Sequence, residues 1–186
     1  MIVDAIVETT TRGRHCYDRD ARTALRGRTI PAILKRLLSD KYLRKSPPKT
    51  AGREQFGRAY AEQVLAWGKR HHATTEDLVR TATVFTSLSI ADALRRFVLP
   101  RARVDELIVA GGGTRNPLLM AQLAAGLPEI EIVPASEFGI PAEAKEAFAF
   151  AVLAYEAYHG RANNLPSATG ARHPAAMGKL VRGRAR

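Results

Sequence analysis

Residues 106–116, ELIVAGGGTRN, decide how this chain folds. The apolar run at 107–110 has the length and composition of a buried strand. Three consecutive glycines follow it, and Asn116 and Pro117 then predict a helix start, with Asn116 as N-cap and Pro117 at the first helical position. A strand, a turn without side chains and a helix N-terminus let a ligand approach the backbone closely. This stretch is therefore the first candidate for a phosphate or nucleoside site.

Apolar residues recur at helical spacing on both sides of this stretch, and capping and breaking residues mark the ends of the helices. Thr74 to Asp77 read as an N-terminal capping signal for the longest helix. The segment KSPPKTAG at 45–52 interrupts the helices, because Pro47 and Pro48 favour an extended chain. The residues expected to be helical are 2–7, 31–38, 53–69, 74–98, 117–126 and 142–159, and a second strand is expected at 130–133.

The order of these elements predicts an α/β fold. Residues 1–100 are mainly helical, and residues 101–186 read strand, helix, strand, helix. Strands joined by helical crossovers indicate a parallel sheet. Two strands are few for a complete sheet, so further strands either escape the pattern or belong to a segment that this chain lacks.

The charge balance raises the question of a nucleic-acid partner. The chain of 186 residues has 29 Lys and Arg against 18 Asp and Glu, a net charge of +11. The basic residues are scattered and form no stripe with interleaved aromatics, which favours a generally basic surface over a nucleic-acid site. No apolar run is long enough to span a bilayer, and Met1 is not followed by a secretory signal. With Cys16 as the single cysteine, we expect a cytoplasmic protein with no membrane partner.

The glycine turn is not a known phosphate-binding fingerprint by spacing. Gly111, Gly112 and Gly113 lack both the G-x-G-x-x-G pattern and a following G-K-[ST]. Taken alone, they fit a tight turn as well as a phosphate cradle. Thr114 and Asn116 add polar groups at the mouth of that turn.

Two further groups of charged residues are candidates for ligand binding. Lys49 and Arg53 follow the double proline, where they either hold an anionic ligand or are simply solvated. Glu143 and Glu146 lie three apart and so share one face at the start of the last long helix. They either hydrogen-bond sugar hydroxyls or favour the positive end of the helix.

The sequence contains no motif for a metal site or for a catalytic nucleophile. No set of His and Cys residues has ligand spacing, no G-x-S-x-G occurs, and we predict no metal site within the chain. Four aspartates are candidate bases, but the sequence places none of them beside a nucleophile: Asp4, Asp18, Asp20 and Asp92.

Several segments together resemble one family, the anhydro-N-acetylmuramic acid kinases, which are sugar kinases of the actin/hexokinase/Hsp70-like ATPase superfamily. The similarity runs from residue 1 to about residue 180. The segments that carry it are MIVDAIV at 1–7, YDRDARTALRGR at 17–28, SPPKTAGREQFG at 46–57, LIVAGGGTRNPLLMAQLA at 107–124, GIPAEAKEAFAFAVLAY at 139–155 and NNLPSATGA at 163–171.

This resemblance implies an actin-like (ribonuclease H-like) ATPase domain and a carbohydrate kinase that uses ATP and Mg²⁺. Such a kinase opens the 1,6-anhydro ring with water and phosphorylates O6, giving N-acetylmuramic acid 6-phosphate for cell-wall recycling. The resemblance assigns Gly111, Gly112, Gly113 and Asn116 to the nucleotide side, and Glu146 with Glu143 to the sugar side. Lys49 and Arg53 match a family motif without an assigned role, in which Thr50 and Ala51 replace the usual Ser-Thr.

The resemblance covers only a C-terminal half. In the family, a segment like FDTGPGN precedes the equivalent of Met1 and carries the aspartate expected to act as base. We therefore expect no catalytic base in this chain, no turnover by the chain alone, and a separate N-terminal half as partner. A second copy of the chain is a further partner that the resemblance leaves open. The alternatives are a non-catalytic remnant that binds a nucleotide or a protein, and a basic nucleic-acid binder.

Overall fold

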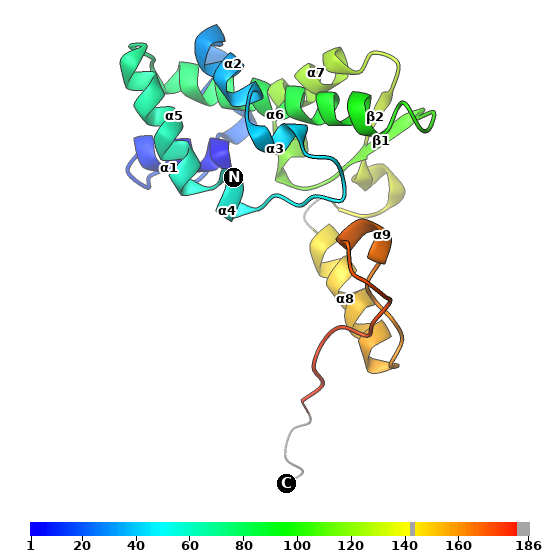
Figure 1. Ribbon diagram of the computed structural model, residues 1–186. Coiled ribbons are helices and arrows are strands. Elements are labelled where there is room, and N and C mark those ends of the chain that lie inside the picture. Colours follow the sequence, from blue (N-terminus) through cyan, green and yellow to red (C-terminus); the bar gives the residue numbers. More distant parts are fainter. Residues whose placement is uncertain (142–143, 182–186) are drawn as a thin grey trace.

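The longest helix, α6 (Thr75–Phe97), runs through the body of the molecule, and the other helices of the first hundred residues pack around it (Figure 1). The computed structural model describes residues 1–141 and 144–181. Before α6 come the helices α1 (Ile2–Thr10), α2 (Pro31–Leu38), α3 (Lys41–Arg44), α4 (Arg53–Phe56) and α5 (Arg58–Arg70), with short 3₁₀ turns η1 (Arg19–Ala21) and η2 (Ala24–Arg26).

The start of α6 is fixed by its cap, as the sequence predicts. The Asp77 N–H donates to Thr74 Oγ1 at 3.1 Å, and the Thr74 N–H donates to Asp77 Oδ2 at 3.1 Å. Asp77 Oδ1 also accepts the N–H of Arg28 at 2.6 Å, which fastens the 12–28 loop to the helix. Gly27 allows this approach, because a Cβ there would lie 2.2 Å from the Glu76 carbonyl.

Two hydrophobic clusters lie along α6. The first is shared with α1, α2 and α5, and the second with α7 (Pro117–Gly126) and the adjoining strand. The larger members of the first cluster are Ile2, Ile6, Val7, Ile33, Leu37, Val64, Leu78, Val79 and Phe85; the second comprises Ala91, Leu123, Leu127 and Ile130.

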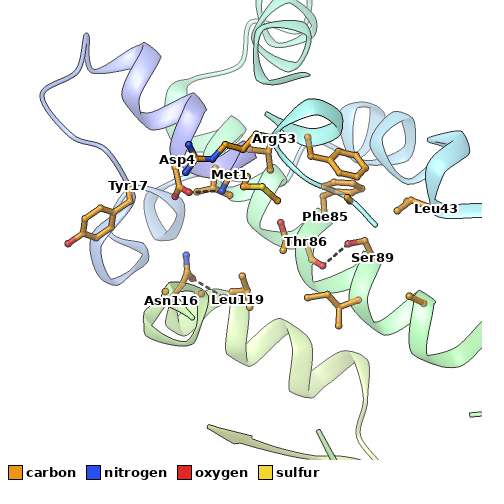
Figure 2. A pocket seen from close by; sticks show the side chains of 18 of the residues that line it. Met1, Asp4, Tyr17, Leu43, Arg53, Phe85, Thr86, Ser89, Asn116 and Leu119 are labelled. Carbon is orange, nitrogen blue, oxygen red and sulfur yellow. Dashed lines mark hydrogen bonds and ion pairs between the residues drawn. The ribbon is translucent and has the colours of Figure 1, made fainter. Parts of the chain in front are cut away.

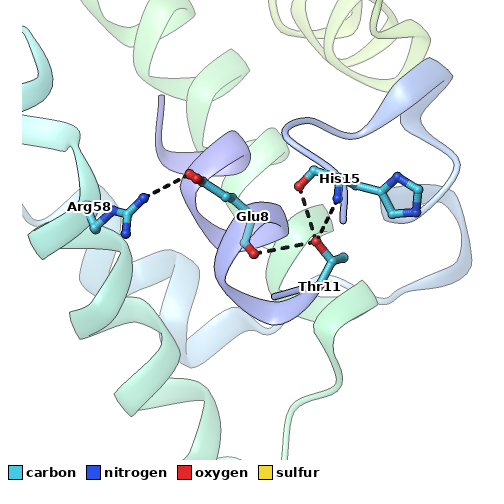
Figure 3. Close-up of polar contacts among 4 residues, drawn as sticks. All are labelled: Glu8, Thr11, His15 and Arg58. Carbon is cyan, nitrogen blue, oxygen red and sulfur yellow. Dashed lines mark hydrogen bonds and ion pairs between the residues drawn. The ribbon is translucent and has the colours of Figure 1, made fainter. Parts of the chain in front are cut away.

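Polar contacts hold α1 in place between α5 and the loop that follows it (Figure 3). The Arg58 guanidinium pairs with Glu8 at 3.1 Å. Thr11 Oγ1 accepts the N–H of His15 at 3.1 Å and donates to the His15 carbonyl at 3.2 Å. Both contacts leave the buried face of α1 free to pack against α6.

The helix expected at 53–69 is two helices, α4 and α5, because Gly57 interrupts it. Gly57 has ψ −147°, outside the helical region. The turn is so tight that a Cβ at this position would lie 2.0 Å from the Arg53 carbonyl oxygen. The periodicity of the apolar residues continues across the break, which explains why the sequence pattern did not reveal it.

The sheet has two strands, β1 (Glu106–Val109) and β2 (Glu131–Pro134), joined by the crossover helix α7. The strands are parallel, with Leu107 opposite Ile132, so the predicted parallel pairing is confirmed. The strand expected at 107–110 is present as β1, but the expectation that it is buried is wrong. Leu107 and Val109 pack on the second cluster, whereas Ile108 on the other face is 55% exposed, although its neighbour Val133 in β2 is buried.

The last long helix, α8 (Lys145–Tyr158), lies below the body in Figure 1 and packs against the segment that follows it, which includes α9 (Pro166–Thr169). Its predicted start, residue 142, lies outside the described residues. Within the described part of the chain, no helix combines the length and the hydropathy of a membrane span.

Candidate functional site

A cavity of about 1440 Å³ opens between α1, α6 and the glycine turn (Figure 2). It brings together segments that are far apart in the chain. Its wall includes Asp4 of α1, Tyr17, Asp18, Arg19 and Asp20 of the first loop, Lys49 and Arg53 of the proline loop, Phe85, Thr86 and Ser89 of α6, and Gly112, Gly113 and Asn116. Two of the three predicted groups of ligand-binding residues therefore lie on one cavity.

The glycine turn presents open backbone to this cavity. Gly111 has φ +92°, a conformation that other residues adopt only with strain, and Thr114 Oγ1 donates to its carbonyl at 2.8 Å. A Cβ added at Gly112 would meet no heavy atom within 4 Å, and one at Gly113 would meet only Leu119 Cδ1 at 3.8 Å. Packing within the chain therefore does not explain why Gly112 lacks a side chain, whereas close approach by a ligand would.

Asn116 caps α7, as the sequence predicts. Its Oδ1 accepts the N–H of Leu119 at 2.9 Å. Figure 2 shows the amide nitrogen turned from that bond toward the open space of the cavity, so a donor remains for a ligand. The Ser87 hydroxyl donates to the Leu119 carbonyl at 3.0 Å, which fixes the first turn of α7 to α6.

Lys49 and Arg53 differ in their contacts. Lys49 Nζ donates to the carbonyls of Tyr42 and Leu43 at 3.3 and 3.2 Å, and it lies over the rings of Tyr42 and Phe97 at 5.0 and 4.8 Å. Lys49 therefore ties the proline loop to α3 and to the end of α6. Arg53 is exposed, and no hydrogen bond or ion pair joins it to another described residue. Its guanidinium is thus available for an anion.

The four candidate bases have different surroundings in the structure. Asp18 is buried, and its carboxylate oxygens accept the N–H groups of Thr23 and Ala24 at 2.8 and 2.9 Å. It shapes the loop that carries Tyr17 and Asp20 along the cavity wall. Asp4 and Asp20 also line the cavity. Asp92 does not, because it pairs with Arg96 at 2.9 Å on the surface of α6.

No sequence pattern indicates the polar residues that α6 turns toward the cavity. Thr86 and Ser89 line it, but their hydroxyls donate to the carbonyls of Ala82 and Thr86 at 2.9 and 2.8 Å. Both hydroxyls therefore use their hydrogen in a bond to a carbonyl of their own helix, and only their acceptor lone pairs remain for a ligand. Threonine and serine inside a helix are too common for a pattern to single them out.

Of the two predicted sugar-side residues, only Glu146 is described, and the structure does not bring it to the cavity. Glu146 is exposed in the first turn of α8 and does not line the cavity. Glu143 lies outside the described residues. Among the residues that are described, no group of three or more His, Cys, Asp or Glu side chains is placed to hold a metal ion.

Comparison with known proteins extends over the whole chain. The model of the family described as anhydro-N-acetylmuramic acid kinase matches residues 1–183. Proteins named anhydro-N-acetylmuramic acid kinase from Streptomyces avermitilis and Salinibacter ruber are 40% and 38% identical over 184 and 180 residues. One from Caldanaerobacter subterraneus is 37% identical over 180 residues.

The coverage of these alignments is unequal. They include 97–98% of this chain but only 45–46% of each relative, so the chain spans about half the length of the curated relatives it matches. The family match includes both the glycine turn and the proline loop that line the cavity. On this basis, the chain belongs to the anhydro-N-acetylmuramic acid kinase family.

Proposed function

We propose that this chain supplies one wall of the active-site cleft of an ATP-dependent anhydro-N-acetylmuramic acid kinase. In the reaction, a base takes a proton from water as the water oxygen adds to C1 of the sugar, the C1–O6 bond breaks, and O6 takes the γ-phosphoryl group of ATP, with ADP as the leaving group. The observation that carries the proposal is the cavity, because it joins an unobstructed glycine turn to an arginine without a partner among the described residues, in a member of this family.

The nucleotide belongs on the side of the glycine turn. The backbone at Gly112 and Gly113 is open to a phosphate or ribose, and the Asn116 amide nitrogen offers a donor at the start of α7. Positioning and charge stabilisation account for most of the catalysis of phosphoryl transfer, so the glycine turn and the start of α7 need to be held rigidly. The hydrogen bond from Ser87 to Leu119 supplies that rigidity.

Mg²⁺ would enter with the nucleotide. In kinase sites it is held mainly by substrate phosphates with one or two carboxylates, so a cluster of protein ligands is not required. Asp4 and Asp20 are the other carboxylates on the cavity wall; Asp4 pairs with the ammonium of Met1 at 2.5 Å and Asp20 with Arg22 at 3.5 Å. When bound, the ion neutralises the charge that develops on the transferred phosphoryl group.

The chain corresponds, in this proposal, to the C-terminal lobe of an actin-like ATPase, acting in the cytoplasm. The base that activates water lies in the other half. Glu146 and Glu143 bind the sugar once that half fixes the position of α8. The half-length coverage of the relatives and the small size of the sheet support the part of this proposal that gives the chain only one half of the enzyme.

The test combines the chain with the part of the Streptomyces avermitilis relative that it does not match. Phosphorus NMR would follow transfer from ATP to the anhydro-sugar. We expect no product from either part alone and N-acetylmuramic acid 6-phosphate from the mixture. Strong phosphorylation by the chain alone would contradict the need for the other half.

The same mixture distinguishes the proposal from a non-catalytic remnant. Calorimetry that detects ATP binding by the mixture, without any product, would favour a remnant that only binds nucleotide. The intact relative serves as the positive control for activity under the same conditions. A gel shift with salt-dependent DNA binding would instead support a nucleic-acid binder.

A further inference from the structure

Helix α8 has an amino-acid composition that does not match its exposure. Eleven of its fourteen residues are apolar, and its charged residues are Lys145, Glu146 and Glu156. A helix that is apolar around most of its circumference is normally buried in a core. In this structure, no residue of α8 is buried.

One stripe of α8 has a partner. Leu153, Glu156 and Ala157 are partly covered by the segment that follows the helix. Asn163 holds that segment in place, because its Nδ2 donates to the carbonyls of Leu153 and Met177 at 2.9 and 3.0 Å. The C-terminal segment therefore covers this stripe and borders a cavity that Phe150 and Tyr158 also line, and it leaves the side of the helix with Phe148 and Val152 open.

The remaining circumference carries large exposed apolar side chains. Phe148, Val152 and Tyr155, at spacing i, i+4 and i+7, form one stripe, with Tyr158 beside it; Phe150 lies on the opposite side of the helix. Phe150 is 70% exposed and Tyr158 is 69% exposed. We call these five residues the α8 surface. A soluble protein rarely leaves so many neighbouring aromatic side chains in water unless another surface covers them.

We propose that the α8 surface is the docking site for the remaining half of a family-length protein. The inference rests on the proposed function, in which this chain works with that half. The relatives have more than half of their length outside the alignment, which is enough chain for a covering layer. The sheet too has one exposed apolar side chain, Ile108.

The chemistry of the surface fits a permanent contact. Its five residues are uncharged, whereas transient interfaces are about as polar as the rest of a protein surface. The matching surface on the other half should therefore be apolar. Since Glu146 begins the same helix, docking would also fix the position of the predicted sugar-binding residue.

The experiment compares Phe150→Glu with Leu25→Glu, a matched control at a side chain on η2 that is 55% exposed. Both residues lie in water in the isolated chain, so circular dichroism and the melting temperature should stay unchanged in both variants. Association with the complementary part of the Streptomyces avermitilis relative is measured by calorimetry. We expect Phe150→Glu to weaken it by about tenfold or more, and Leu25→Glu to leave it unaltered.

Hydrogen exchange gives a second measurement that needs no variant. The amides of α8 should exchange more slowly in the mixture than in the chain alone. Equal exchange, or unchanged association of Phe150→Glu, would overturn the proposal. So would a dimer of the chain alone that Phe150→Glu converts to a monomer, because a second copy would then cover the α8 surface.

The outcome can be separated from that of the proposed function. If the two parts associate through α8 but transfer no phosphate, the kinase proposal fails and the docking site stands. If the mixture phosphorylates the sugar and Phe150→Glu associates normally, the docking site fails and the kinase proposal stands.

Discussion

The ammonium of Lys49 lies 3.2 Å from the carbonyl oxygen of Leu43, in the last turn of α3. Lys49→Met should therefore lower stability by about 1 kcal/mol, because it removes charge-assisted hydrogen bonds at a half-buried helix end. Denaturant unfolding would measure the change. Nucleotide or sugar affinity of the assembled protein should change little.

Arg53→Met is the matched control, at the first residue of α4, directly after the same loop. Arg53 is exposed and has no described partner, so its loss should alter stability by less than about 0.5 kcal/mol. Binding of ATP or of the sugar carboxylate to the assembled protein should weaken, since the guanidinium is available for an anion. If Arg53→Met destabilises the fold as much as Lys49→Met does, this division of roles is wrong.

The glycine turn allows a second matched pair. Gly112→Ala should keep the fold within about 0.5 kcal/mol, because a Cβ there meets nothing within 4 Å, yet it should obstruct the nucleotide. Gly111→Ala should cost about 1–3 kcal/mol, because φ +92° with ψ 177° is accessible almost only to glycine. Thermal unfolding and ATP calorimetry on the assembled protein would separate the two effects. Normal ATP affinity in Gly112→Ala would contradict the nucleotide assignment.

Asp77 predicts a pH dependence of stability. The hydrogen bond from the Arg28 N–H, followed by those with Thr74, lowers the pKa of Asp77 below its usual 3.8. Since the pKa is depressed in the folded state, the stabilisation is present above about pH 4 and is lost as the pH falls through the folded-state pKa. Asp77→Asn should be less stable than the parent by about 1 kcal/mol at pH 7.

The difference in folding stability between Asp77→Asn and the parent should become smaller below pH 4. Denaturant unfolding at several pH values between 7 and 3 would measure it. Asp92→Asn is the control, because its carboxylate pairs only with Arg96 on the surface. If the stability difference between Asp77→Asn and the parent stays constant down to pH 3, protonation of Asp77 does not contribute to the pH dependence of stability.

Asn163 should control the order of the segment after α8. Asn163→Ala removes its bonds to Leu153 and Met177, and we expect faster hydrogen exchange and proteolysis across 163–177 with little change in the melting of the body. Asn163→Asp keeps an acceptor for the Met177 N–H and should give an intermediate effect. Unchanged exchange in both variants would show that other contacts hold the segment.

Local chemistry explains which parts of the fold could be predicted. Thr74 and Asn116 cap helices through side chains within three residues of the helix start, so the sequence alone places these boundaries. The parallel pairing of β1 and β2 follows from one helical crossover. The break at Gly57 was missed because it depends on a tight turn inside an unbroken apolar pattern.

The candidate site could be predicted only in part, because its geometry depends on distant segments. Lys49 and Arg53 are equivalent in sequence terms, and only the carbonyls of α3 and the ring of Phe97 distinguish them. Likewise, the buried role of Asp18 depends on the N–H groups of Thr23 and Ala24. The exposure of Ile108 was not predicted, since burial depends on which layers cover a strand.

Helix α6 belongs to both hydrophobic clusters, through Phe85 in one and Ala91 in the other. The cavity wall uses the stretch between them, at Thr86, Ser89 and Ile90. Because one rigid rod is shared, the two clusters should melt together in a single cooperative transition. Helix α6 contacts both α7 and α1, so a displacement of α7 would pass through the Ser87–Leu119 hydrogen bond to α6 and from there to the packing of α1.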